Sequence, residues 1–211
     1  IKYHHPNIDY IMYSDDINMG ETCRSGWTLR PIKDFPPEYS VQDRNKDIKW
    51  HPFRAFGLTY DYSIYIDTKV EFIGDPLYLI DKICDKLKYG FTCHMYDYKP
   101  TNYEDNWVDV YSHIDYLVSV HVGIKNNLLL FKQLLEKENF PQKSRLLETA
   151  IVITDLTNQF AQEIENKIFD NYINVNTYRD QVVVPYVLWK NDIRIQDCGI
   201  LGEYCGGSRY F

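Results

Sequence analysis

The sequence lacks any hydrophobic run long enough to cross a bilayer. Its longest candidate, Leu128–Phe131, has only four residues, whereas a spanning helix needs about 20 predominantly apolar residues. The first residues, Ile1 to Pro6, also lack the apolar stretch of a secretory signal. We therefore expect a soluble, cytoplasmic protein with no membrane span.

Cysteine is sparse and shows no metal-binding pattern. The chain has five cysteines in 211 residues, and no two of them have the CxxC spacing. An odd count without this spacing favours free thiols in a reducing compartment and argues against a zinc site built from cysteine.

Three nucleotide and hydrolase motifs are also missing. The chain has no GxxxxGK[ST] phosphate loop, no GxGxxG fingerprint and no GxSxG elbow, and its six histidines do not form an HExxH pattern. Readings as a P-loop kinase, a dinucleotide-dependent dehydrogenase or a serine hydrolase therefore lose their usual support.

Basic residues are outnumbered. Thirty acidic and 23 basic residues give a net charge of −7. A broad face that binds nucleic acid or an anionic membrane usually carries the opposite excess, so we expect no nucleic-acid partner. A small anionic ligand would need local help from a lysine, a helix N-terminus or a metal ion. The 19 tyrosines suit a carbohydrate surface, although a general composition bias explains them equally well.

What is present is the composition of one folded domain, residues 1–211, with 45% apolar residues. Apolar runs typical of strands cover Ile8–Ser14, Trp27–Ile32, Tyr62–Asp67, Val70–Ile73, Phe91–Met95, Glu148–Thr154 and Ile193–Asp197. Helical spacing is found over Trp50–Phe56, from Asp75 to Gly90, within 103–139, after Thr157 with Phe160, Ile164 and Ile168 buried, and from Arg179 to Asp192. The alternation predicts an α/β fold with a mostly parallel sheet flanked by helices.

Ligands of such sheets collect beyond the carboxyl ends of the strands. Several polar residues follow apolar strand runs and could converge on one edge: Asp15, Asp16, Asp67, His94, Asp97, Asp155 and Asp197. Asp67 is the foremost candidate, because a rigidly held carboxylate there can ligate Mg²⁺ or Mn²⁺. The competing interpretation is an aspartate that caps a turn or pairs with Lys69.

Several of these segments, taken in order, resemble one enzyme group. Tyr62–Asp67 with Asp75-Pro76 is similar to the "YSIWIDG…DP" core of GT-A glycosyltransferase-like proteins of bacteria, plants and large viruses. Lys49–Pro52 resembles the group's "K-x-x-P" helix, and His94 with Glu104 resembles its "H…E" segment. Other matching segments are Glu148 ahead of Ile151–Ile153, and Arg179-Asp180-Gln181 with Tyr186–Lys190. The likeness runs from about Ile8 to Asn191 and is greatest to the glycosyltransferase domains of chlorella viruses, which are implicated in capsid glycan synthesis.

The resemblance implies a GT-A fold, a Rossmann-like sheet that binds a nucleotide-sugar with Mn²⁺ or Mg²⁺. It gives Asp67 the final acidic position of the D-x-D element and makes Lys49 a candidate for the diphosphate. Arg179, Asp180 and Gln181 would face the donor sugar or the acceptor. Asp180 and Glu148 are the candidate carboxylates for a general base or a sugar-positioning group. The remaining candidates are Tyr65 and His94 in the nucleotide-sugar site, and Asp15 and Asp16 as nucleobase or ribose contacts.

Three departures from the group's pattern matter. Tyr65 stands where a strict D-x-D has its first aspartate, so a metal would need another ligand. Phe53 occupies a position where relatives often have histidine. The group's early "TAIFGxYD" strand has no clear counterpart among these residues: either it lies outside them, or Ile8–Ser14 takes its place.

The expected activity is the metal-dependent transfer of a hexose from a UDP-sugar to a hydroxyl of a glycan or glycoprotein, in the host cytoplasm if the gene is viral. Two alternatives stay open at this point. A nucleotidyltransferase would release pyrophosphate from a nucleoside triphosphate, and a non-catalytic glycan-binding module would need neither metal nor nucleotide.

Overall fold

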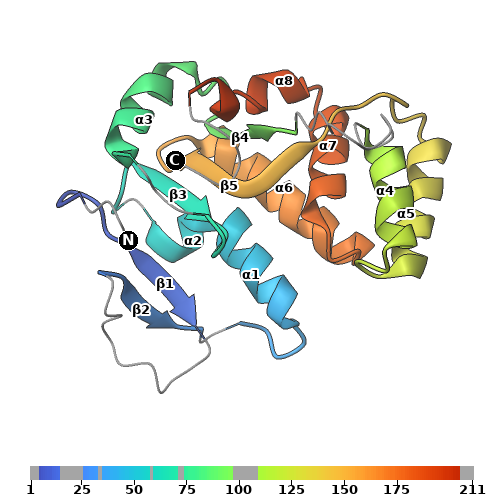
Figure 1. The fold of residues 1–211 in the computed structure, drawn as a ribbon, viewed down its shortest axis with the longest axis horizontal. Coiled ribbons are helices and arrows are strands. Elements are labelled where there is room, and N and C mark those ends of the chain that lie inside the picture. The colour runs from blue at the N-terminus through green and yellow to red at the C-terminus, as the bar shows by residue number, and fades with distance from the viewer. Residues whose placement is uncertain are drawn as a thin grey trace.

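The computed structural model describes residues 5–14, 26–32, 35–57, 59–70, 74–96 and 109–204. Within them the strands form two sheets (Figure 1). In the smaller sheet, β1 (Ile11–Ser14) pairs in parallel with β2 (Thr28–Pro31). In the larger one, β5 (Leu147–Asp155) lies between β3 (Tyr62–Ile66) and β4 (Phe91–Met95).

Helices make up the rest of the regular structure. In chain order they are α1 (Val41–Trp50), α2 (Pro52–Phe56), α3 (Pro76–Ile83), α4 (Val110–Ser119), α5 (Lys125–Lys137), α6 (Gln159–Val175), α7 (Asp180–Lys190) and α8 (Ile195–Cys198). Two 3₁₀ turns cover Cys84–Lys86 and Leu201–Glu203. None of the described helices is both long and apolar enough to cross a membrane.

The fold is mixed α/β, as the sequence predicts, but the expectation of a mostly parallel sheet is wrong for the described strands. β5 runs antiparallel to both β3 and β4. Since β3 and β4 therefore run in the same direction, α3 joins them as the crossover of a parallel β-α-β unit would. The order of elements along the chain predicts this common direction, but it does not reveal that β5 inserts between the two strands.

Strand β5 is buried on both faces. Ile151 and Ile153 pack on the α3 side, together with Ile83, while Val152 belongs to the larger apolar cluster that includes residues of α4 to α7. Because successive side chains of a strand point to opposite faces, a strand between two apolar layers reads as a continuous apolar run.

Capping residues fix the starts of several helices. Asp75 caps α3 and Pro76 occupies its first turn, as predicted. Asn158, rather than the predicted Thr157, caps α6 by accepting hydrogen bonds from the backbone N–H groups of residues 160 and 161. Phe160, predicted to be buried, is 41% exposed because it lies in this first turn.

Two other local predictions are wrong. Residues 42–49, expected to be a polar lead-in, belong to α1, which begins with a capping box between Ser40 and Asp43. Residues 195–197, expected in a strand, lie in α8. Residues 71–73 of the expected strand Val70–Ile73, and residues 103–108 of the expected helical stretch 103–139, fall outside the described residues.

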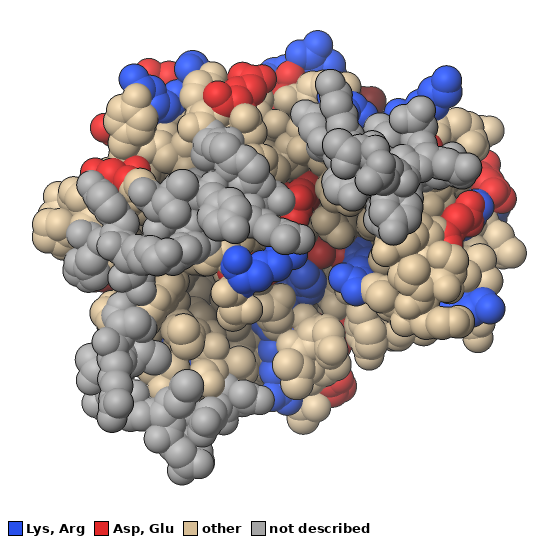
Figure 2. Space-filling model, in the orientation of Figure 1, with Lys and Arg blue, Asp and Glu red and all other residues tan. Residues whose placement is uncertain are grey.

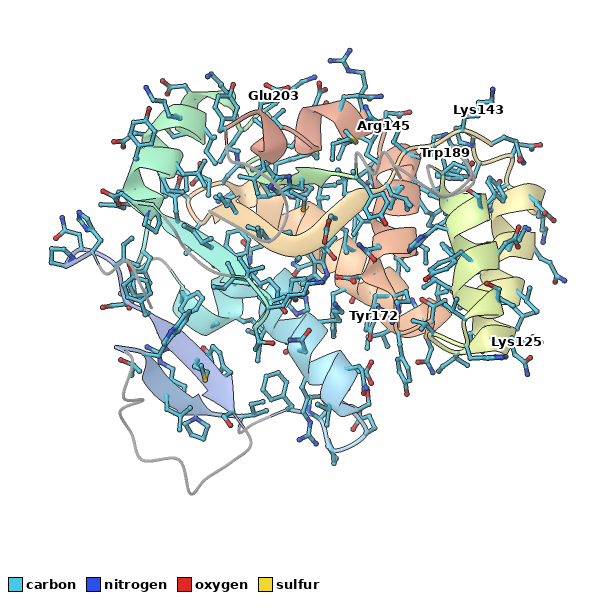
Figure 3. All side chains as sticks on the ribbon, viewed as in Figure 1. Lys125, Lys143, Arg145, Tyr172, Trp189 and Glu203 are labelled. Carbon is cyan, nitrogen blue, oxygen red and sulfur yellow. The ribbon has the colours of Figure 1, made fainter. Side chains whose placement is uncertain are left out.

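Helix α1 is held against the body of the fold from two sides. Trp50, at its end, is fully buried in the larger apolar cluster. The hydroxyl of Tyr172 on α6, labelled in Figure 3, donates a hydrogen bond to Asp43 Oδ1 at 3.2 Å. These contacts place the polar face of α1 next to the end of β3.

Candidate functional site

The carboxyl ends of β3 and β4 lie at the same edge of the larger sheet as the amino end of β5. The backbone N–H of Asp67, just after β3, donates to the carbonyl of Ala150 at 2.8 Å. His94 and Glu148 are cross-strand partners of β4 and β5. Asp67, His94 and Glu148 are thus brought to one edge from distant parts of the chain.

Asp155 and Asp197 do not lie at this edge, contrary to the expectation from the sequence. Asp155 pairs with Tyr62 at the opposite end of β3, because β5 is antiparallel. Asp197 lies near the start of β4, where Lys88 and Arg194 bind its carboxylate at 2.8 and 2.6 Å. Asp15, Asp16, Asp97 and Glu104 fall outside the described residues.

A cleft of about 820 Å³ opens between β1, α1 and the end of β3. The polar side chains in its wall include Asn45, Tyr65, Asp67 and Lys69. Its volume falls within the range of about 300–1,000 Å³ typical of ligand sites. Figure 2 shows basic and acidic side chains together in the hollowed centre of one face.

Asp67 presents a partly exposed carboxylate to this cleft, with 32% of its side chain accessible. The hydroxyl of Tyr65 donates to Oδ1 at 2.9 Å and orients the group. Lys69 Nζ lies 3.8 Å from Oδ2 and is itself largely exposed. Such a solvent-exposed pair contributes about 0–1 kcal/mol, so a cation could displace Lys69 at little cost.

Tyr65 is placed as a hydrogen-bond donor. Burial, followed by the charge of Asp67, raises the pKa of its hydroxyl far above the usual value. Asn45 of α1 donates to the same hydroxyl oxygen at 3.0 Å. Tyr65 therefore supports the Asp67 carboxylate and adds no negative charge of its own.

Behind Asp67 lies a buried ion cluster centred on Asp180, the first residue of α7. Oδ2 of Asp180 accepts hydrogen bonds from Lys49 Nζ at 3.0 Å, Trp50 Nε1 at 3.1 Å and Thr149 Oγ1 at 3.1 Å. Oδ1 pairs with Lys46 Nζ at 3.0 Å. The cluster connects α1, β5 and α7.

The two lysines control the charge of Asp180. Burial alone would raise the pKa of this carboxyl, but Lys46 and Lys49 outweigh burial and hold it well below its usual range. Asp180 is only 3% exposed. A permanently ionised carboxylate whose oxygens already accept hydrogen bonds is a poor general base. We therefore expect Asp180 to position neighbouring groups and not to accept a proton.

Lys46 and Lys49 differ in access. Lys49, the predicted phosphate ligand, is 1% exposed and stacks over the Tyr65 ring at 4.8 Å. Burial lowers the pKa of Lys49, against the opposing effect of Asp180. Lys46, one turn earlier, is 15% exposed; its pKa is raised because Asp180 and Asp67 together outweigh burial.

Lys46 is therefore the lysine better placed to meet a ligand, and sequence analysis missed it. The signal was available in principle, because Lys46 and Lys49 share a face at i, i+3 spacing on α1. That face becomes visible only when residues 41–50 are recognised as a helix.

His94 and Glu148 have different surroundings despite being neighbours. His94 is buried, and burial lowers the pKa of its imidazole, which favours the neutral ring. Glu148 is half-buried, and its carboxylate has no hydrogen bond or ion pair with the part of the chain that the structure describes. Of the carboxylates predicted as a base, Glu148 is the less engaged.

Arg179 and Gln181, the other predicted site residues at the start of α7, have different surroundings from Asp180. Arg179 precedes the helix, and its Nε is buried without a hydrogen-bond partner. Burial, and then the Arg179 charge, lowers the pKa of His113 on α4 to about 4. Gln181 is half-buried in the first turn of α7.

The single carboxylate of Asp67 suits a metal site that is completed by water and substrate. Among the described residues no group of three or more His, Cys, Asp or Glu side chains could hold a metal ion. Mg²⁺, however, is commonly bound through one or two carboxylates together with water and substrate phosphates. The oriented, accessible carboxylate of Asp67 fits that mode and does not fit an all-protein cage.

Comparisons with known proteins add no family to this description. No protein-family model, no curated protein and no solved structure matches the chain.

Proposed function

We propose that the protein is a metal-dependent glycosyltransferase of GT-A type that transfers a hexose from a UDP-sugar to a hydroxyl of a glycan or glycoprotein. The observation that carries the proposal is the cleft at the end of β3, whose wall contains the accessible carboxylate of Asp67, oriented by Tyr65, together with Lys69. The sequence resemblance around Tyr62–Asp67 supports the same assignment.

The charges of the site suit a diphosphate. Lys46, Lys49 and Lys69 lie near two carboxylates, Asp67 and Asp180. With Glu148 at the same edge, three positive charges face three negative ones, so the site is locally neutral in a protein with a net charge of −7. A divalent cation held at Asp67 would make the site positive and would stabilise the negative charge that a leaving UDP develops.

In this proposal each residue of the site has a separate role. Lys46 contacts the phosphates, and Asp180 holds Lys46 and Lys49 in place. Tyr65 orients Asp67, which would hold Mn²⁺ or Mg²⁺. Such an ion, when bound, acts as a Lewis acid on phosphoryl oxygens. Glu148, the unengaged carboxylate at the same edge, accepts the proton of the acceptor hydroxyl or positions the sugar.

Thermal unfolding with UDP tests the proposal. A ligand that binds only the folded state raises the midpoint, so UDP with Mn²⁺ should raise Tm more than UDP or Mn²⁺ alone. Equal shifts with and without the metal would contradict metal-dependent donor binding.

Asp67→Asn is the decisive variant. It keeps the shape of the side chain but removes the charge, and losing an interaction made in the transition state typically costs about 10²–10³-fold in rate. UDP-sugar turnover, followed as UDP release, should fall by that order. Asp81→Asn on the exposed face of α3 is the matched control and should retain activity. Turnover by Asp67→Asn within threefold of wild type would exclude the assigned role.

A further inference from the structure

A second cavity, of about 310 Å³, lies at the other end of β3. It is formed where the chain enters β1 and β3 and where α3 begins. Tyr62 lies in its wall and is five residues from Asp67, a separation of about 16 Å along a strand. The two cavities share part of their wall, including Trp27, Phe56 and Ser63, but have different charged residues.

Aromatic rings dominate this second cavity. Tyr10 and Trp27 meet edge-to-face with their centroids 5.7 Å apart, and Phe56 and Tyr60 do the same at 5.7 Å. Tyr62 adds a fifth ring. Tyrosine and tryptophan offer an apolar face together with a polar tip, which matches a ligand with an apolar ring face and polar edges.

The charged groups in the wall of this cavity are acidic. Asp9 and Asp61 are exposed members of the wall, and none of the described wall residues is Lys, Arg or His. Asp9 Oδ2 accepts a hydrogen bond from the Tyr60 hydroxyl at 2.5 Å. The side chain of Asp61 has no hydrogen bond or ion pair with the described part of the chain. Two carboxylates repel a phosphate, so a nucleotide does not suit this cavity.

An organic cation and a neutral sugar remain, and the surroundings favour the sugar. Arg30 lies over the Phe56 ring at 6.0 Å and close enough to Tyr60 to lower its pKa against the stronger effect of Asp9. Arg30 therefore carries a positive charge beside Tyr60, which disfavours a second cation on that side of the cavity. A sugar needs acceptors for its hydroxyls and an apolar surface for its ring, and both are present.

We propose that this aromatic, acidic cavity between the starts of β1 and β3 binds a single neutral hexose unit of a glycan. Asp61 accepts hydrogen bonds from the sugar hydroxyls, and the rings of Tyr60 and Tyr62 pack on its carbon face. The assignment does not require the transferase activity, because the cavity is defined by other residues than Asp67 and Lys46.

Titration with a panel of methyl hexopyranosides, in the absence of nucleotide and metal, tests the proposal by calorimetry or NMR. We expect saturable binding of at least one glycoside and weaker or no binding of choline and UMP. Asp61→Asn should weaken glycoside binding about tenfold or more, since it removes a charged acceptor. The matched control Asp81→Asn should bind as wild type. Tyr60→Phe, which keeps the ring, should weaken binding less.

Three results would overturn the proposal: no glycoside binding, tighter binding of choline than of any glycoside, or binding unchanged in both Asp61→Asn and Tyr60→Phe. Circular dichroism and Tm of each variant establish that it is folded. The UDP–Mn²⁺ shift should be unchanged in Asp61→Asn, so failure at one cavity can be distinguished from failure at the other.

Discussion

Asp180→Asn is the substitution for which the structure predicts the largest effect on stability. The aspartate accepts three hydrogen bonds on Oδ2 and pairs with Lys46 through Oδ1. Replacing it with a neutral amide leaves the ammonium of Lys49, which is 1% exposed, without a counter-charge. Removing one partner of a buried ion pair typically costs about 3–5 kcal/mol, because the other charge stays buried.

The expected loss of unfolding free energy can be measured by urea unfolding, and its effect on Tm by thermal unfolding. For a chain of 150–250 residues each kcal/mol lowers Tm by about 2–4 °C, so the Tm of the variant should be about 6–20 °C below that of the wild type. Asp81→Asn, an exposed aspartate on α3, is the control and should change stability by less than about 0.5 kcal/mol.

Two further measurements test the cause of the stability loss, the unpaired charge of Lys49, as well as its magnitude. In the Asp180→Asn background, Lys49→Met removes the unpaired charge, so the double variant should be more stable than the sum of the single losses predicts. The pKa of Asp180 is depressed in the folded state, so its contribution is present above the unfolded value of about 3.9 and is lost as pH falls below it. The gap between wild type and variant should therefore shrink below about pH 4. A loss under about 1 kcal/mol at neutral pH, or strictly additive variants, would refute the account.

Two other predictions concern neighbouring groups. The folded-state pKa of His113 is about 4, so the unfolded chain takes up a proton near pH 6.5 that the native state does not. The free energy of unfolding of the wild type should therefore fall by up to about 3 kcal/mol between pH 6.5 and 4. His113→Phe should flatten this part of the curve of stability against pH. A curve identical to that of the wild type would contradict the burial of a neutral imidazole. Tyr65→Phe removes the hydrogen-bond donor to Asp67 Oδ1. It should reduce the Tm shift caused by UDP and Mn²⁺ while leaving β3 intact. A Tm shift as large as that of the wild type would show that the hydroxyl does not orient Asp67.

The parts of the fold that the sequence predicts are those with a local cause. Strands β4 and β5 are recognisable because they are mostly buried and apolar, and the half-buried β3 because it is rich in tyrosine and isoleucine. Helix α3 is recognisable because Asp75 and Pro76 mark its start. The direction of β5 has no local signal. It depends on pairing with both neighbouring strands, and so the predicted parallel sheet is wrong in the larger sheet.

Helix α1 shows the same limit for the candidate site. Its residues are mostly polar, so hydrophobic periodicity does not mark it as a buried helix. Lys49 is nevertheless buried, because its partner Asp180 lies 131 positions later in the chain. A pairing of such long sequence separation cannot be read from spacing. Lys49, and not Lys46, is the predicted phosphate ligand because of the resemblance around Lys49–Pro52, and nothing in the sequence shows that Lys49 is the more buried of the two lysines.

The Asp180 cluster also connects stability with the proposed chemistry. It ties α1, β5 and α7 together, and the same bonds place Lys46 within electrostatic range of Asp67. Loss of Asp180 should therefore affect folding and phosphate binding together. Loss of Lys46, which is 15% exposed, leaves Asp180 Oδ1 without this partner, but Oδ2 keeps its three hydrogen-bond donors. Lys46→Met should consequently weaken UDP binding with a smaller loss of Tm than Asp180→Asn. If UDP affinity is retained in that variant, the positive charge that holds the diphosphate must come from elsewhere in the cleft.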